Sequence, residues 1–151
     1  MSRPLSTHVV APLAAGIAVY LLFRSNALLV FRWIELAGLG GALAELRALA
    51  APLRPLLPGW FLYSAPDGLW VYAVTSFMCL TWRDESAARA ALWIAAGPVL
   101  AIGWELAQLL RLVPGTFDPA DLVSCAIATG ASIAAHRPPS LPLPALGESH
   151  G

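Results

Sequence analysis

Residues 88–113, ARAALWIAAGPVLAIGWELAQLLRLV, decide the fold class of this chain. The stretch is almost wholly apolar and carries only Arg89, Glu105 and Arg111 as charged residues. A helix needs about 20 apolar residues to cross the hydrocarbon core of a bilayer. Gly97-Pro98 in the middle indicates a bend, which membrane helices tolerate. We therefore predict a transmembrane helix over 88–113.

The composition of the whole chain agrees with a membrane location. The 151 residues are 58% hydrophobic and 12% charged, with a mean hydropathy of +0.70. Soluble domains contain about 25% charged residues, and a short soluble domain cannot bury so much apolar surface. Nine acidic residues balance nine basic ones, all of them Arg. Without a basic tract, no nucleic-acid partner is expected.

Three further apolar stretches predict spans over about 7–23, 66–82 and 120–135. A cleaved signal peptide is the alternative for the first, but no small-x-small cleavage site follows it, and we favour a retained helix. Short turns connect the last three spans and predict antiparallel neighbours. We expect an all-α, polytopic transmembrane bundle of about four spans, forming one domain over 1–136. The Pro- and Ser-rich residues 137–151 predict a disordered tail.

Residues 26–50 mix apolar side chains with Arg32, Glu35, Glu45 and Arg47. A charge at the centre of a span costs about 2.5–3.5 kcal/mol. An amphipathic helix lying in the membrane interface avoids this cost, whereas a fifth span would have to pair Arg32 with Glu35. We predict an interfacial helix over 26–50, followed by a proline-rich linker.

Polar side chains gather at one end of the predicted bundle. There the second span begins, the third ends and the fourth begins, so one membrane face receives Asp67, Glu105, Gln108, Thr116, Asp118 and Asp121. A charge as deep in the membrane as Glu105 must be paired, hydrated or neutralised. Such carboxylates can bind a divalent cation, and through it a phosphate headgroup, or act as an acid beside an ionised partner. Alternatively, the aspartates cap helices and Glu105 pairs with Arg111 or Gln108.

Other residue patterns point to packing rather than chemistry. Small residues recur every four positions at Ala126, Gly130 and Ala134 and predict a helix-packing face. The three histidines show no ligand spacing, so we expect no metal site from them. Cys79 and Cys125 lie in apolar stretches and are interpreted as small hydrophobic residues.

The fragment Trp104-Glu105-Leu106-Ala107-Gln108, followed by residues 115–121 (GTFDPAD), resembles the C-terminal half of VanZ-like membrane proteins. That family carries a Glu-x-x-Gln pair on one helix, then a turn and an Asp that opens the last helix. The likeness covers about residues 64–135, with Asp67 where the family has an Asp before a span. Cys125 stands where the family has Asn, and Gly68-Leu69 where it has basic and His residues. The resemblance implies a small multi-pass protein of the bacterial cytoplasmic (inner) membrane and no particular reaction.

Two functions of different class follow from these patterns. In the first, a polar acidic pocket at one leaflet binds a cation or the headgroup of a lipid or envelope precursor, as a binding protein or an enzyme. In the second, the chain is a non-catalytic accessory subunit of a larger membrane complex and docks through the small-residue face. Membrane lipids are the expected partners in the first case and other membrane subunits in the second. No motif in the sequence specifies a cofactor.

Overall fold

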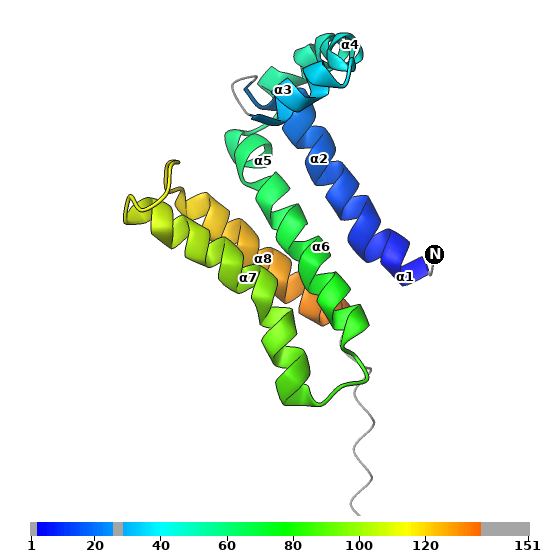
Figure 1. The fold of residues 1–151 in the computed structure, drawn as a ribbon, viewed down its shortest axis with the longest axis vertical. Coiled ribbons are helices and arrows are strands. Elements are labelled where there is room, and N and C mark those ends of the chain that lie inside the picture. Colours follow the sequence, from blue (N-terminus) through cyan, green and yellow to red (C-terminus); the bar gives the residue numbers. More distant parts are fainter. Residues whose placement is uncertain (1–2, 26–28, 137–151) are drawn as a thin grey trace, which may run out of the picture.

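The computed structural model describes residues 3–25 and 29–136, and within these ranges the chain is helical and contains no strand. Four long helical runs alternate in direction along the bundle (Figure 1). They are Arg3–Phe23, composed of α1 (Arg3–Leu5), a π-helical turn (Ser6–Val10) and α2 (Ala11–Phe23), then α6 (Ala65–Thr81), α7 (Ala87–Leu109) and α8 (Pro119–His136). The predicted all-α class is confirmed. The predicted tail over 137–151 lies outside the described residues.

Helix α6 is the centre of the bundle. It packs against α2, α7 and α8, and its most extensive contact is with α8. In Figure 1, α6 lies between the N-terminal helical run and the α7–α8 pair. The short connections after α6 and α7 thus yield the antiparallel neighbours that the turn lengths predict.

The contact between α6 and α8 is close and partly polar. Val71 and Cys125 meet there with almost no exposed surface. Ser76 and Ser132 form a hydrogen bond of 2.9 Å between their hydroxyls, and the Ser124 hydroxyl donates to the Ser64 carbonyl at 3.0 Å. We call the contact formed by these two hydrogen bonds and by Val71 and Cys125 the α6–α8 seam.

Several small polar side chains are buried inside the bundle, whereas many large apolar side chains lie on its surface. Thr75, Ser76 and Ser132 are fully buried, whereas Leu92 and Leu100 are 70% and 66% exposed. Buried small polar residues and outward-facing large apolar residues are typical of helices that pack inside lipid. Within the described residues, Arg3–Phe23 and Ala87–Leu109 are the two helices that are long and apolar enough to cross a membrane.

Residues 29–63 form short helices near the end of α2 and the start of α6 (Figure 1). These are α3 (Leu29–Leu36), α4 (Gly40–Ala50), a 3-10 helix (Ala51–Leu56) and α5 (Gly59–Tyr63). The prediction of one continuous helix over 26–50 is wrong, because the chain breaks at Gly38, which has φ +74°. Leu39 N–H donates to the Ile34 carbonyl there, an ending that favours glycine. Residues 26–28 lie outside the description.

Two arginines from this short-helix region close the end of α2. Arg54 donates to the Phe23 carbonyl at 2.9 Å, and Arg47 donates to the Arg24 carbonyl. Phe23, Ala50 and Leu62 form a small apolar cluster beneath these contacts. Carbonyl groups at a helix end need such partners, so these arginines fix the position where α2 ends.

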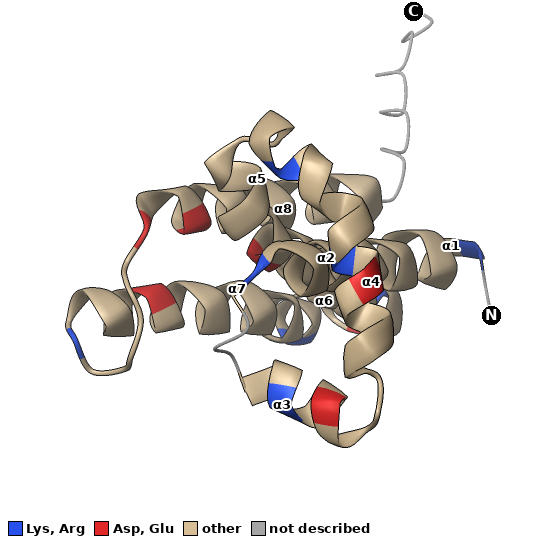
Figure 2. Cartoon of the chain, turned by 90° about the horizontal axis from the view of Figure 1, so that it is seen from above, with Lys and Arg blue, Asp and Glu red and all other residues tan. Residues whose placement is uncertain are grey.

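Charged residues lie mainly at the ends of the long helices and on α3 and α4 (Figure 2). At the end away from the short helices, Arg89 pairs with Glu85 at 2.7 Å. Trp82 and Trp93 stack beside this turn with ring centroids 5.1 Å apart. Charges and aromatic rings thus mark one end of the bundle, while α2 carries no charged residue at all.

The seam depends on a glycine, and this gives a stability prediction. A Cβ at Gly68 would collide with the Ser124 hydroxyl. We expect Gly68→Ala to displace that hydroxyl from the Ser64 carbonyl and lower the free energy of unfolding by about 1–3 kcal/mol. The measurement is reversible unfolding of the purified chain in mixed micelles.

The matched control is Gly103→Ala in α7, where a Cβ meets nothing within 4 Å. This variant should keep the wild-type stability or gain up to about 1 kcal/mol, because alanine favours helix. Equal stability of the two alanine variants would contradict the close α6–α8 contact.

Candidate functional site

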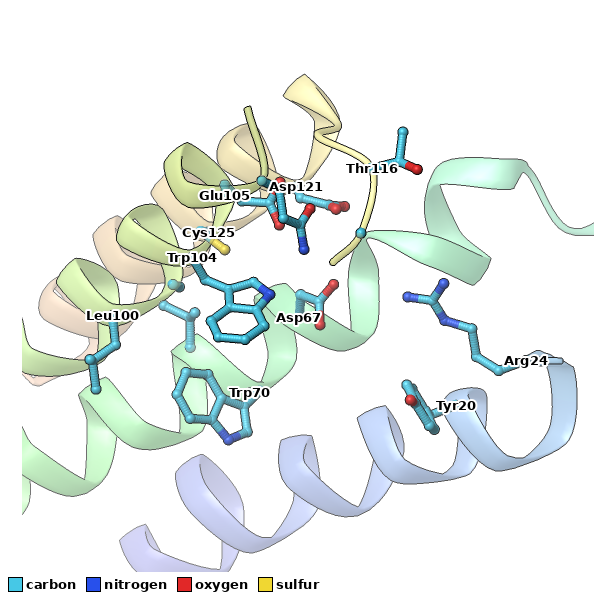
Figure 3. Close-up of a pocket in the computed structure, with 14 residues that line it drawn as sticks. Tyr20, Arg24, Asp67, Trp70, Leu100, Trp104, Glu105, Thr116, Asp121 and Cys125 are labelled. Atoms are coloured by element: carbon cyan, nitrogen blue, oxygen red, sulfur yellow. The ribbon is translucent and has the colours of Figure 1, made fainter. Parts of the chain in front are cut away.

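A cavity of about 800 Å³ opens where α2 and α7 end and α6 and α8 begin. Figure 3 shows side chains from all four helices directed toward it. Of the six residues predicted to meet at one face, five line this cavity: Asp67, Glu105, Gln108, Thr116 and Asp121. The antiparallel order of the last three helices is the reason that residues so distant in sequence come together.

Three carboxylates, on three different helices, line the cavity. Asp67 lies in the first turn of α6 and Asp121 in the first turn of α8. The N-terminal ends of helices stabilise negative charge, which allows both aspartates to lie in an apolar bundle. In the described part of the chain, no ion pair involves Asp67, Glu105 or Asp121.

Glu105 is the most deeply buried of the three, with only 8% of its surface exposed. Its Oε2 accepts one long hydrogen bond, from the Asp118 N–H at 3.5 Å, and no bond to its Oε1 is found among the described residues. The predicted alternative of a Glu105–Arg111 ion pair is not found in the described chain. A buried carboxylate with so little compensation is costly to stability, so Glu105 has capacity to bind a partner.

Asp118 does not line the cavity and has a local structural role. Its Oδ1 accepts a hydrogen bond from the Ala120 N–H at 2.9 Å. This is the geometry of an N-cap at the start of α8. The alternative interpretation of the aspartates as helix caps therefore holds for Asp118, whereas Asp121 faces the cavity and its Oδ1 is buried without a hydrogen-bond partner.

Gln108 connects the wall of the cavity to the turn that follows α7. In the amide orientation that satisfies both neighbours, its nitrogen donates to the Thr116 carbonyl at 3.0 Å and its oxygen accepts from Trp104 Nε1 at 2.9 Å. Gln108 therefore holds the Trp104 ring in place. A side chain at Gly115, which has φ +138°, would collide with this amide.

Arg24 also lines the cavity, and the sequence patterns do not indicate this role. Its guanidinium lies over the rings of Tyr20 and Tyr63, 5.5 and 5.1 Å from their centroids, and donates to the Tyr63 carbonyl at 3.3 Å. Its Nε is buried and has no hydrogen-bond partner in the part of the chain that the structure describes. Figure 3 shows the guanidinium directed toward the side of the cavity where Asp67 lies. Only the packing of α2 against α6 reveals this position.

An apolar groove of about 390 Å³ adjoins the polar cavity. It runs between α2, α3 and α6 and is lined by aliphatic residues such as Leu13, Ile17 and Ile34. Tyr20, Asp67 and Trp70 line both hollows, so the groove and the cavity are direct neighbours.

Two other predicted features lie away from the cavity. Ala126, Gly130 and Ala134 are exposed, and a Cβ at Gly130 would meet nothing within 4 Å. Within this chain α8 packs instead through Cys125, Ala128 and Ser132. His8 and His136, which show no ligand spacing in the sequence, have ring centroids 4.9 Å apart, and His8 Nδ1 is 2.7 Å from the Tyr72 hydroxyl.

Comparison with known protein families, with curated proteins and with solved structures finds no match to this chain. The likeness to VanZ-like proteins therefore stays a prediction from the residues that carry it.

The different roles of Asp118 and Asp121 can be separated by substitution. Asp118→Ala removes the N-cap of α8 and should lower the free energy of unfolding by about 1 kcal/mol. Asp118→Asn should retain most of that stability, because asparagine also accepts the Ala120 N–H. Thermal unfolding in detergent measures both. Equal losses for the two variants would show that the charge of Asp118, rather than its capping oxygen, stabilises the fold.

Proposed function

We propose that this chain is a four-span protein of the bacterial inner membrane, of VanZ-like type, that holds the headgroup of a lipid or envelope precursor in its polar cavity. One observation carries the proposal. Three carboxylates that form no ion pair with any described residue line a cavity of about 800 Å³ at one end of a bundle whose outer surface is apolar. Small-molecule sites typically measure about 300–1,000 Å³.

The arrangement of the helices supports four spans. Arg3–Phe23 and Ala87–Leu109 meet the length and hydropathy of a membrane helix. Helices α6 and α8, of 17 and 18 residues, pack alongside them and against each other. At a rise of about 1.5 Å per residue, each is about 25 Å long and reaches across most of the hydrocarbon core. Their packing against the two candidate spans supports a path across the same layer.

The short helices support an interfacial location at the end of the bundle that holds the cavity. Leu36 and Leu49 are 85% and 77% exposed and lie near Glu35 and Arg47 in the chain. Interfacial helices typically direct their apolar side chains into the lipid and their charged side chains toward the headgroups. The cavity would then open at the depth where lipid headgroups reside.

A second candidate function is supported by the exposed small-residue face. Ala126, Gly130 and Ala134 lie on the surface of α8, and within residues 3–25 and 29–136 no atom lies within 4 Å of a Cβ built at Gly130. Small residues allow close contact between membrane helices. An accessory subunit of a larger membrane complex would dock another helix on this face.

Substitution of Glu105 tests the headgroup function. We expect the wild-type chain, purified in mild detergent, to retain bound lipid through extensive washing. Glu105→Gln removes the buried charge with little change in shape and should lower the retained lipid about tenfold or more, since hydrogen bonds to charged groups contribute about 1.5–3 kcal/mol. The measurement is lipid extracted per mole of protein, determined by mass spectrometry.

Glu45→Gln is the matched control, because Glu45 is exposed on α4 and far from the cavity lining. It should retain lipid as the wild type does, and circular dichroism should show both variants folded. Equal lipid retention by Glu105→Gln would contradict the headgroup function. Purification with a fixed-stoichiometry partner, lost on Gly130→Leu but not on Gly103→Leu, would favour the accessory subunit instead.

A further inference from the structure

We infer that the cavity and the adjoining groove form one site for a phospholipid whose headgroup carries a primary amine beside its phosphate. The inference rests on the proposed headgroup function and adds the chemistry of the ligand. In this arrangement the ammonium group contacts the carboxylates, the phosphate contacts Arg24, and one acyl chain lies in the groove between α2, α3 and α6.

The charges of the cavity favour a cationic group. Asp67, Glu105 and Asp121 face a single basic lining residue, Arg24, so the lining has a formal excess of two negative charges. An anionic headgroup would be repelled by this excess, because like charges close together disfavour the charged form of each group. A primary ammonium has three N–H donors. It therefore supplies what the uncompensated Glu105 and the unpartnered Asp121 Oδ1 lack.

The spacing of the carboxylates favours an organic cation over a metal ion. No three His, Cys, Asp or Glu side chains of the described residues come close enough together to hold a metal. Metal ions require oxygen ligands at about 2.0–2.6 Å. An ammonium group with its methylene arm occupies more space and bonds at longer distances. Trp70 and Trp104 also line the cavity and offer aromatic faces that attract cations.

Arg24 is placed to receive the phosphate of the same molecule. The rings of Tyr20 and Tyr63 both contact its guanidinium, and its buried Nε has no hydrogen-bond partner among the described residues. A planar guanidinium suits phosphate oxygens. Figure 3 shows Arg24 at the end of α2 and Asp67 on α6, so a basic and an acidic group approach the cavity from different segments, as a zwitterionic headgroup requires.

The apolar groove indicates that the ligand is a lipid rather than a free headgroup. It begins at the residues Tyr20, Asp67 and Trp70 that also line the polar cavity. An amphiphile bound with its headgroup among the carboxylates would pass directly from polar to apolar surroundings. Each buried methylene contributes about 0.8 kcal/mol, so the groove adds affinity that a soluble headgroup cannot obtain.

The test is native mass spectrometry of the full chain titrated with lipids of identical acyl chains. Phosphatidylethanolamine should bind about tenfold or more tightly than phosphatidylcholine, whose quaternary amine has no N–H donor, and than phosphatidylglycerol, which has no amine. Asp67→Asn should remove this preference. Arg24→Gln should weaken both zwitterionic lipids alike. Asp84→Asn, at an exposed aspartate, is the matched control and should change nothing.

Ile17→Trp tests the groove, because Ile17 is half exposed and a larger ring can occupy the groove without entering the core. It should weaken binding of all three phospholipids, while soluble glycerophosphoethanolamine binds weakly to wild type and variant alike. Equal binding of the three lipids, or phosphatidylglycerol binding that requires Ca²⁺ or Mg²⁺, would overturn the amine inference. If the amine inference failed but Glu105→Gln still released lipid, the proposed headgroup function would stand. A wild-type chain that retained no lipid would refute both the headgroup function and the amine inference.

Discussion

The α6–α8 seam is the contact on which the rest of the structure depends. The Ser124–Ser64 and Ser76–Ser132 hydrogen bonds join two helices whose outer surfaces are apolar, and Gly68 allows their backbones to approach. Hydrogen bonds between membrane helices contribute about 0.6–2 kcal/mol each, and packing at Val71 and Cys125 adds to them. Because Asp67 precedes Gly68 and Asp121 lies one turn before Ser124, the seam also determines that two carboxylates meet.

The cavity forms where the α6–α8 seam meets the ends of α2 and α7. Glu105 enters from α7 about one turn before that helix ends at Leu109, and Arg24 enters from the end of α2, where Arg47 and Arg54 bind the last carbonyls. Each charged group has a local reason to be tolerated: helix N-termini for the aspartates and aromatic rings for Arg24. Glu105 has the least compensation within the chain. The site is therefore electrostatically incomplete, which is the condition in which a ligand gains the most by binding.

Much of this arrangement follows from the sequence, and the misses have physical causes. Alternating helix direction predicts which helix ends meet, so five of the six proposed residues come together. Direction alone does not say which helices are lateral neighbours, and the position of Arg24 beside Tyr63 and the contact of His8 with His136 depend on that. The sequence does not reveal the break at Gly38, because charged and apolar residues are mixed in the same way before and after it. The sequence also predicts Asp118 in the pocket, because it does not distinguish an aspartate that caps a helix from one that lines a cavity.

The central claim is that the carboxylates of different helices meet at one face of a membrane. Single cysteines at positions 67, 121 and 85, in a Cys79→Ala, Cys125→Ala background, can be labelled with a membrane-impermeant maleimide in sealed vesicles of known orientation. Positions 67 and 121 should react from the same side and position 85, in the α6–α7 turn, from the other side. Labelling of positions 67 and 121 from opposite sides would contradict the account, because no common cavity could then exist.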